Sequence, residues 1–190
     1  SERFDPPLCD VFIRTAVRQG KTNASEAKWI VDEIARLVAD PAHEGRDIGV
    51  ISLIGNEQSE KIGRMLIEDK RIGTEVIKKR NIIYGDARTM QGQERSIVFL
   101  SMVATPGKVV SQTAKSDQQR INVAMSRAKD RLYLVRSVAQ SDLKPSDIKL
   151  AVLQHFEKPI PEGRAHTGPE TENLINRCQS GFEREVQQHL

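Results

Sequence analysis

Long hydrophobic runs and paired cysteines are both missing from this 190-residue chain. Its longest apolar stretches, IGVISLIG and SIVFLSMVA, have fewer than ten residues, whereas a transmembrane helix needs about 20. We expect no secretory leader and no contact with a membrane. The two cysteines, Cys9 and Cys178, lie far apart and lack the spacing of metal ligands, so we expect a reduced, cytoplasmic protein.

Aromatic residues are also scarce, at 4% of the chain. This scarcity argues against base stacking as the main way of binding nucleic acid. The net charge of +3 is compatible with nucleic acid but does not require it. The four histidines have neither catalytic nor metal-ligand spacing; they are His43, His155, His166 and His189. We therefore predict no metal site among them.

A complete phosphate-binding loop is absent as well. The stretch VRQGKTNA contains Gly20-Lys21-Thr22, the last part of the pattern G-x-x-x-x-G-K-[ST], but Thr15 stands where the first glycine is needed. We interpret Gly20 as a turn residue and Thr22 as the entry to a helix. The same missing glycine argues against a small nucleotide kinase built on these three residues.

Short apolar runs alternate with amphipathic segments along residues 1–156. Strands are expected at 8–13, 48–54, 81–86, 96–103 and 131–135, and helices at 23–40, 57–70, 117–130 and 146–156. Asn23 followed by Glu26 predicts a capping box at the start of the first helix. The alternation predicts an α/β domain with a mostly parallel sheet and helices on both faces.

The character of the sequence changes after this domain. Residues 157–171 are rich in proline and glycine and have no periodicity, which indicates a linker. Residues 172–190 are expected to be a helical tail, and they resemble the start of a restriction-endonuclease-like domain that continues further. In that case Glu183 or Glu185 would be an early carboxylate of a metal site; the alternative is a plain amphipathic helix.

Two polar strings in the domain suggest phosphate chemistry. The first, TMQGQERSIVFLSMV at 89–103, places Gly92 in a loop just before a buried strand, where glycine permits a sharp turn. The second, QQRINVAMSRAKDRLYLV at 118–135, holds Arg120 and Arg127 seven residues apart on the expected helix, about 10 Å apart on one face. Planar guanidinium groups suit phosphate, although isolated arginines are mostly solvated surface residues.

The two strings resemble motifs of a known family. TMQGQE before a strand is similar to motif V of superfamily 1 helicases, and QRINVAMSRAK before RLYLV is similar to their motif VI. GRDIGVISLIGNEQSEKI resembles motif IV of the branch containing the nonsense-mediated-decay and replication helicase-nucleases. The resemblance covers about residues 3–156 and implies the second, C-terminal lobe of a RecA-like, P-loop NTPase-type pair.

The resemblance also implies cofactors and partners. ATP and Mg²⁺ would be held mainly by the protein's own first RecA-like lobe, which carries the phosphate loop and the magnesium-binding carboxylates. Single-stranded nucleic acid, with DNA favoured, would run across the lobe. The 190 residues alone would be inactive. A non-catalytic nucleic-acid-binding or regulatory domain with a helicase-derived fold is the alternative.

Residue roles follow from the same resemblance. Arg127 would be the catalytic arginine finger that reaches the γ-phosphate. The remaining nucleotide contacts would come from Gly92, Glu94 and Arg120, and the nucleic-acid contacts from Ser52, Thr89 and Gln91. The sequence departs from the family at Ser52-Leu53-Ile54, where T-P-Y is usual, and at Met90, where an aromatic residue is usual.

Overall fold

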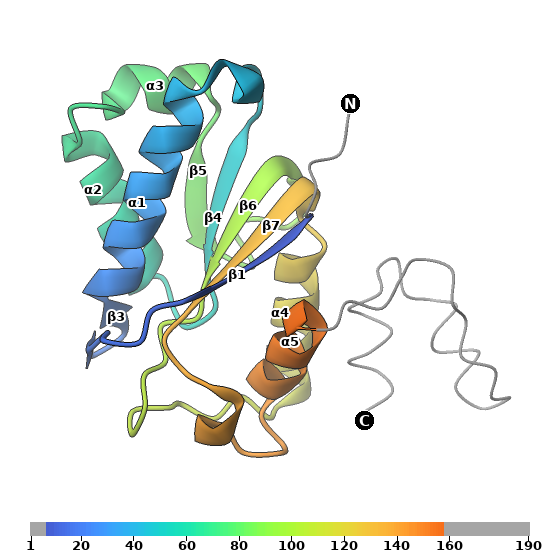
Figure 1. Cartoon of the computed structure of the whole chain (residues 1–190). Helices are drawn as coiled ribbons and strands as arrows, with labels where there is room; N and C mark the ends of the chain where they lie inside the picture. Colours follow the sequence, from blue (N-terminus) through green and yellow to red (C-terminus); the bar gives the residue numbers. More distant parts are fainter. Residues whose placement is uncertain (1–6, 158–190) are drawn as a thin grey trace, which may run out of the picture.

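A computed structural model describes residues 7–157, in which a parallel sheet lies between two layers of helices (Figure 1). The strands lie in the order β1 (Leu8–Phe12), β7 (Ala128–Arg136), β6 (Arg95–Ser101), β4 (Ile48–Ser52) and β5 (Ile83–Asp86). Every neighbouring pair in this sheet is parallel. The predicted α/β class is thus confirmed, and the arrangement fits a RecA-like, P-loop NTPase-type fold.

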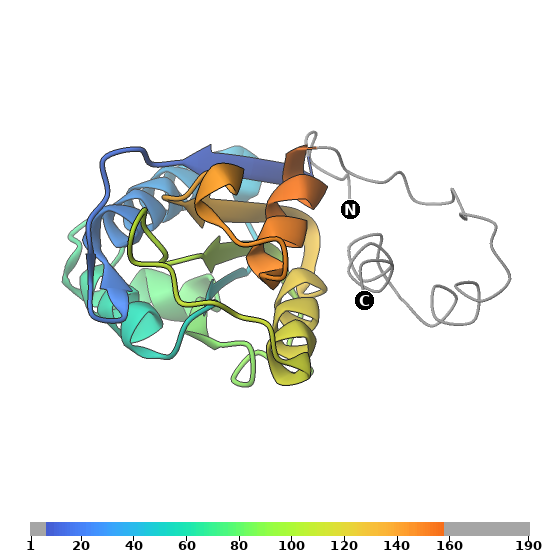
Figure 2. The ribbon, with the colours of Figure 1, turned by 90° about the horizontal axis from the view of Figure 1, so that it is seen from below.

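The two helical layers bury opposite faces of the sheet (Figure 2). One layer contains α1 (Ala24–Ala39), α2 (Glu57–Glu68) and α3 (Gly73–Lys79), and the other contains α4 (Lys115–Met125) and α5 (Ile148–Glu157). Because side chains alternate along a strand, Ile97 and Phe99 of β6 pack into the α1 core while Val98 and Leu100 pack into the α4 core. The expected linker and tail at 157–190 lie, apart from Glu157, outside the described residues.

A two-stranded hairpin occupies the place of the incomplete phosphate loop. Its strands are β2 (Arg18–Gln19) and β3 (Thr22–Asn23). Gly20 has φ +58, a left-handed conformation that favours glycine, and the Thr22 hydroxyl donates to the Gln19 carbonyl at 3.0 Å. Lys21 forms an ion pair with Glu57 at 3.0 Å. The turn interpretation of Gly20 is therefore confirmed.

Only half of the predicted capping box forms at the start of α1. The Asn23 side chain accepts a hydrogen bond from the Glu26 backbone N–H at 3.1 Å, as expected of a cap. The prediction of the reciprocal bond, from the Asn23 backbone N–H to the Glu26 side chain, is wrong. The Asn23 backbone N–H donates to the Gln58 side-chain oxygen at 2.8 Å instead. The Glu26 carboxylate accepts from the Asn23 side-chain amide at 3.0 Å and bonds other groups as well.

Glu26 joins the start of α1 to the carboxyl ends of β6 and β7. Its carboxylate is fully buried and accepts from the hydroxyls of Ser101 at 2.7 Å and Ser137 at 2.8 Å, and from the Val103 backbone N–H at 2.8 Å. Val103 has φ 66, which is strained for a β-branched residue. We infer that the Glu26 bond helps to hold this strained turn, which leads from β6 toward α4.

The helix expected at 117–130 is shorter than predicted. α4 ends at Met125, Ser126 and Arg127 form a turn, and β7 begins at Ala128. Ala128 pairs with Arg95 of β6, so strand pairing ends the helix although the sequence continues with good helix formers. Arg127 therefore does not lie on the helix that carries Arg120. The prediction that the two arginines share one helical face is wrong.

Candidate functional site

Residues 87–94 connect β5 to β6 by crossing β4 on the side of α4, where Ala87 and Met90 are buried in the α4 core. This crossing segment approaches the sheet closely at two glycines. A Cβ atom on Gly85 would lie 2.5 Å from the Thr89 Cβ, and one on Gly49 would lie 2.7 Å from the Met90 Cε. Glycine at both strand positions therefore allows the first polar string to lie against the sheet.

Ser52 and Thr89 lie at the carboxyl ends of β4 and β5, and the third nucleic-acid candidate, Gln91, follows on the crossing segment. Ser52 pairs with Asp86, whose carboxylate accepts from the backbone N–H and the hydroxyl of Thr89 at 2.9 and 3.1 Å. Thr89 and Gln91 are exposed. Ser52 is only 3% exposed, and its hydroxyl donates to the Ile54 carbonyl at 3.0 Å. Thr89 and Gln91 are thus accessible to a ligand, while the Ser52 side chain is enclosed by its own turn.

Two nucleotide candidates meet at the amino ends of β6 and β7. The Arg95 backbone N–H donates to the Arg127 carbonyl at 2.9 Å, which places Glu94 beside the turn that contains Arg127. Glu94 is exposed and Arg127 is half-buried. The Arg127 guanidinium donates to the Val123 carbonyl and to the Ser126 hydroxyl, each at 3.0 Å. The remaining donors of its fork are available to an anion.

Gly92 lies between these two groups of residues. It is exposed, has φ +75, and has no neighbour that an added Cβ would meet. Glycine is therefore required here for its left-handed backbone and not for space. The crossing segment reverses direction at this point before entering β6.

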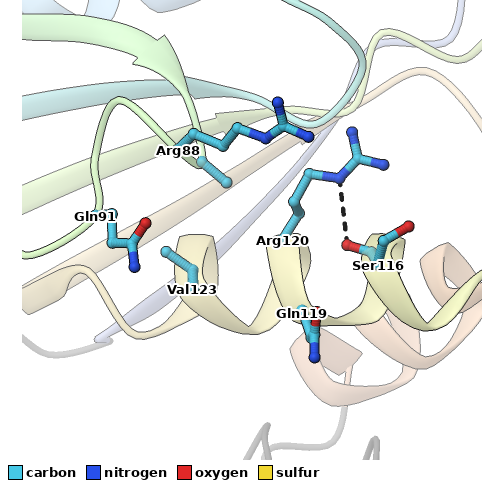
Figure 3. A pocket seen from close by; sticks show the side chains of 7 residues that line it. Arg88, Gln91, Ser116, Gln119, Arg120 and Val123 are labelled. Carbon is cyan, nitrogen blue, oxygen red and sulfur yellow. Dashed lines mark hydrogen bonds between the residues drawn. The ribbon is translucent and has the colours of Figure 1, made fainter.

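Arg120 lies in a pocket of about 340 Å³ between the crossing segment and α4 (Figure 3). This pocket brings the two polar strings together in space. Its lining residues are Ala87, Arg88, Gln91, Ser116, Gln119, Arg120 and Val123. The structure thus groups Arg120 with the nucleic-acid candidate Gln91, and the nucleotide candidate Arg127 bonds the carbonyl of another lining residue, Val123.

The lining of the pocket includes two guanidinium groups, and each has a carboxylate nearby, Asp117 beside Arg120 and Asp86 near Arg88. Arg120 donates to the Asp117 carboxylate at 2.5 Å and to the Ser116 carbonyl at 3.2 Å. Arg88 is exposed, and no described residue forms a hydrogen bond or an ion pair with its side chain. Arg88 was not predicted from the sequence, since a single arginine in a loop has no pattern that marks it.

No metal centre is evident in residues 7–157. That part of the chain contains no group of three or more His, Cys, Asp or Glu side chains arranged to hold a metal ion. Glu183 and Glu185 lie outside it. Nor is any helix in the same residues both long and apolar enough to cross a membrane.

Comparison with known proteins gives two matches. A family model described as an AAA domain matches residues 11–139. A Danio rerio protein named "Putative helicase mov-10-B.2" is 30% identical over 125 residues, which cover 60% of this chain and 12% of the relative. The aligned region thus spans about an eighth of that relative's length.

Proposed function

The chain belongs to the AAA-domain family, and we propose that residues 1–156 are the second RecA-like lobe of an ATP-dependent superfamily 1 helicase. The observation that carries this proposal is the meeting of the two polar strings. Gln91 and Arg120 line one pocket, and the Arg95 N–H bonds the Arg127 carbonyl. The relative named as a helicase supports the same class of activity.

In this proposal, one end of the crossing segment binds ATP. Arg127, with Gly92 and Glu94 beside it, would face the triphosphate, and its planar fork would stabilise charge that develops on the γ-phosphate. Mg²⁺ supplies charge neutralisation on the phosphates when bound. Since residues 7–157 offer no cluster of metal-binding side chains, we place the Mg²⁺ ligands and the phosphate loop on a separate first lobe.

The other end of the crossing segment would bind single-stranded nucleic acid, and we favour DNA. Thr89 offers a hydroxyl at the carboxyl end of β5, where ligands usually bind in open α/β sheets, and Gln91 offers an amide further along the crossing segment. Such groups contact backbone phosphates without reading sequence. Ser52 would act through the turn that it forms with Ile54, because its own hydroxyl is enclosed.

The chain by itself is expected to show no ATPase activity, because its sequence has no complete phosphate loop. Hydrolysis of ATP should be measured with and without single-stranded DNA, and the Lys21→Ala variant compared. Turnover that disappears in Lys21→Ala would contradict the two-lobe proposal. It would show that the hairpin with Gly20 and Lys21 acts as a phosphate loop.

The Thr89→Ala variant is expected to bind single strands several-fold more weakly, and to a similar extent for unrelated sequences, because a backbone contact is lost. Fluorescence anisotropy on several oligonucleotides measures this effect. Thermal melting is the control, since Thr89 also bonds Asp86. A variant that melts earlier but binds normally would show that Thr89 serves only the turn.

A further inference from the structure

We propose that the pocket between Arg88 and Arg120 binds one phosphate group of a single-stranded nucleic-acid backbone. The inference deepens the proposed function and depends on it. Figure 3 shows the two guanidinium groups turned toward each other, Arg88 from the crossing segment and Arg120 from α4. Two like charges in one pocket repel each other. An anion between them would reduce this repulsion and accept a charge-assisted hydrogen bond from each guanidinium group.

The charge of the pocket fits a phosphodiester. Asp117 pairs with Arg120 and the Asp86 carboxylate interacts electrostatically with Arg88, so the pocket has little excess charge, although no described residue bonds the donors of the Arg88 side chain. A phosphodiester carries one negative charge, whereas the triphosphate of ATP carries several. Gln91, Gln119 and Ser116 supply uncharged polar groups around the same space, as is usual where a site positions a backbone and does not read bases.

The position of the pocket places it next to the other nucleic-acid candidates. Its walls include Ala87 and Arg88, which begin the crossing segment directly after β5. The Glu94–Arg127 pair lies where the segment ends, and there the Arg127 guanidinium donates to the carbonyl of Val123, another lining residue, at 3.0 Å. The pocket therefore adjoins Thr89 and Gln91, and it would extend their contact surface onto α4.

The test compares binding of a fluorescent single-stranded oligonucleotide to the unaltered chain, to Arg88→Gln and to Arg120→Gln. Each variant is expected to bind about tenfold more weakly at low salt. The slope of log K against log salt should fall by about 0.7, the value for one phosphate contact on a single strand. Arg64→Gln is the matched control, because Arg64 is an exposed arginine on α2 in the opposite layer.

Two further arms identify the source of the phosphate. With an oligonucleotide that has uncharged methylphosphonate linkages, Arg88→Gln should bind as the unaltered chain does. ATP and inorganic phosphate should bind equally to both proteins. An Arg88→Gln defect in ATP binding without a defect in oligonucleotide binding would overturn the assignment to nucleic acid.

The outcomes separate this inference from the proposed function. If the unaltered chain binds single strands and both variants bind equally well, the pocket is not a phosphate site, although the function stands. If the unaltered chain shows no salt-dependent binding, both are wrong. If Arg120→Gln is destabilised, the result with Arg88→Gln decides. The Arg88 side chain bonds no described residue, so replacing it leaves no partner unpaired.

Discussion

Arg127→Ala is expected to lower ATP turnover by about 10³–10⁵-fold in a protein that contains this domain together with a phosphate-loop lobe. The expectation follows from the proposal that the guanidinium acts on charge that develops as the γ-phosphate is transferred. An interaction made mainly in the transition state lowers kcat and leaves binding of ATP nearly unchanged. Steady-state kinetics and a separate measurement of ATP affinity would show this difference.

Two further variants sharpen this test. Arg127→Lys keeps the positive charge but lacks the planar fork, so we expect it to lower ATP turnover nearly as much as Arg127→Ala does. Arg71→Ala removes an arginine that is exposed on the other helical layer and is paired with Asp32 and Asp69, and it should leave turnover unchanged. Near-normal turnover in Arg127→Ala would show that Arg127 only supports the turn before β7 through its bonds to Val123 and Ser126.

Glu26→Ala is expected to destabilise the domain by about 3–5 kcal/mol. It removes the acceptor for two hydroxyls, the Asn23 amide and the Val103 backbone N–H, all of which lie in the buried end of the sheet. Glu26→Gln should cost less, about 1–3 kcal/mol, because glutamine fills the same space and keeps one acceptor oxygen. The remaining cost arises because its NH₂ group must face one N–H donor. Chemical denaturation of the whole chain measures both values.

The same carboxyl group should make stability depend on pH. Burial raises the pKa of Glu26 from its usual value near 4.5 to about 7, and the hydrogen bonds from Ser101, Val103 and Ser137 offset only part of that effect. Between these two values the folded chain keeps the proton and the unfolded chain has lost it. The contribution of Glu26 to stability is therefore full below pH about 4.5, and falls by about 1.4 kcal/mol per pH unit up to about 7.

Glu26→Gln provides the control for this pH dependence, since glutamine does not titrate. Its stability curve should be flatter than that of the unaltered chain across the same interval. Glu60→Gln, at an exposed position on α2, should follow the unaltered chain. If the unaltered chain and Glu26→Gln show the same dependence on pH, the carboxyl of Glu26 is ionised in the folded state throughout the interval.

The sequence predicted those parts of the fold that have strong local patterns. The strand at Ile48–Ser52 is buried along its whole length, and such continuous apolar runs are typical of central parallel strands. Helix α3 was missed because it is only seven residues long and just two of its apolar side chains, Val76 and Ile77, pack against the core, which is too few to give a periodic pattern. The early end of α4 was missed because it depends on the pairing of Ala128 with Arg95, a contact that no local pattern reveals.

The candidate site was predictable in part for the same reason. Glycine, glutamine and arginine at motif spacing drew attention to both polar strings, and the structure brings these strings together. Arg88 joins Arg120 only because the crossing segment folds over β4 toward α4. Glu26 was interpreted only as a capping residue, since its partners Ser101 and Ser137 are more than seventy positions away in sequence.

Gly49 and Gly85 have a consequence for how relatives of this chain should be compared. Neither glycine has a functional group, yet each determines how closely Met90 or Thr89 can approach the sheet. A methyl group on Gly85 would meet the Thr89 Cβ, next to the backbone, and would push the crossing segment outward, whereas one on Gly49 would displace only the flexible end of Met90. We therefore expect an alignment of active relatives to keep glycine at position 85 as strictly as the proposed arginine finger, and to allow alanine more often at position 49.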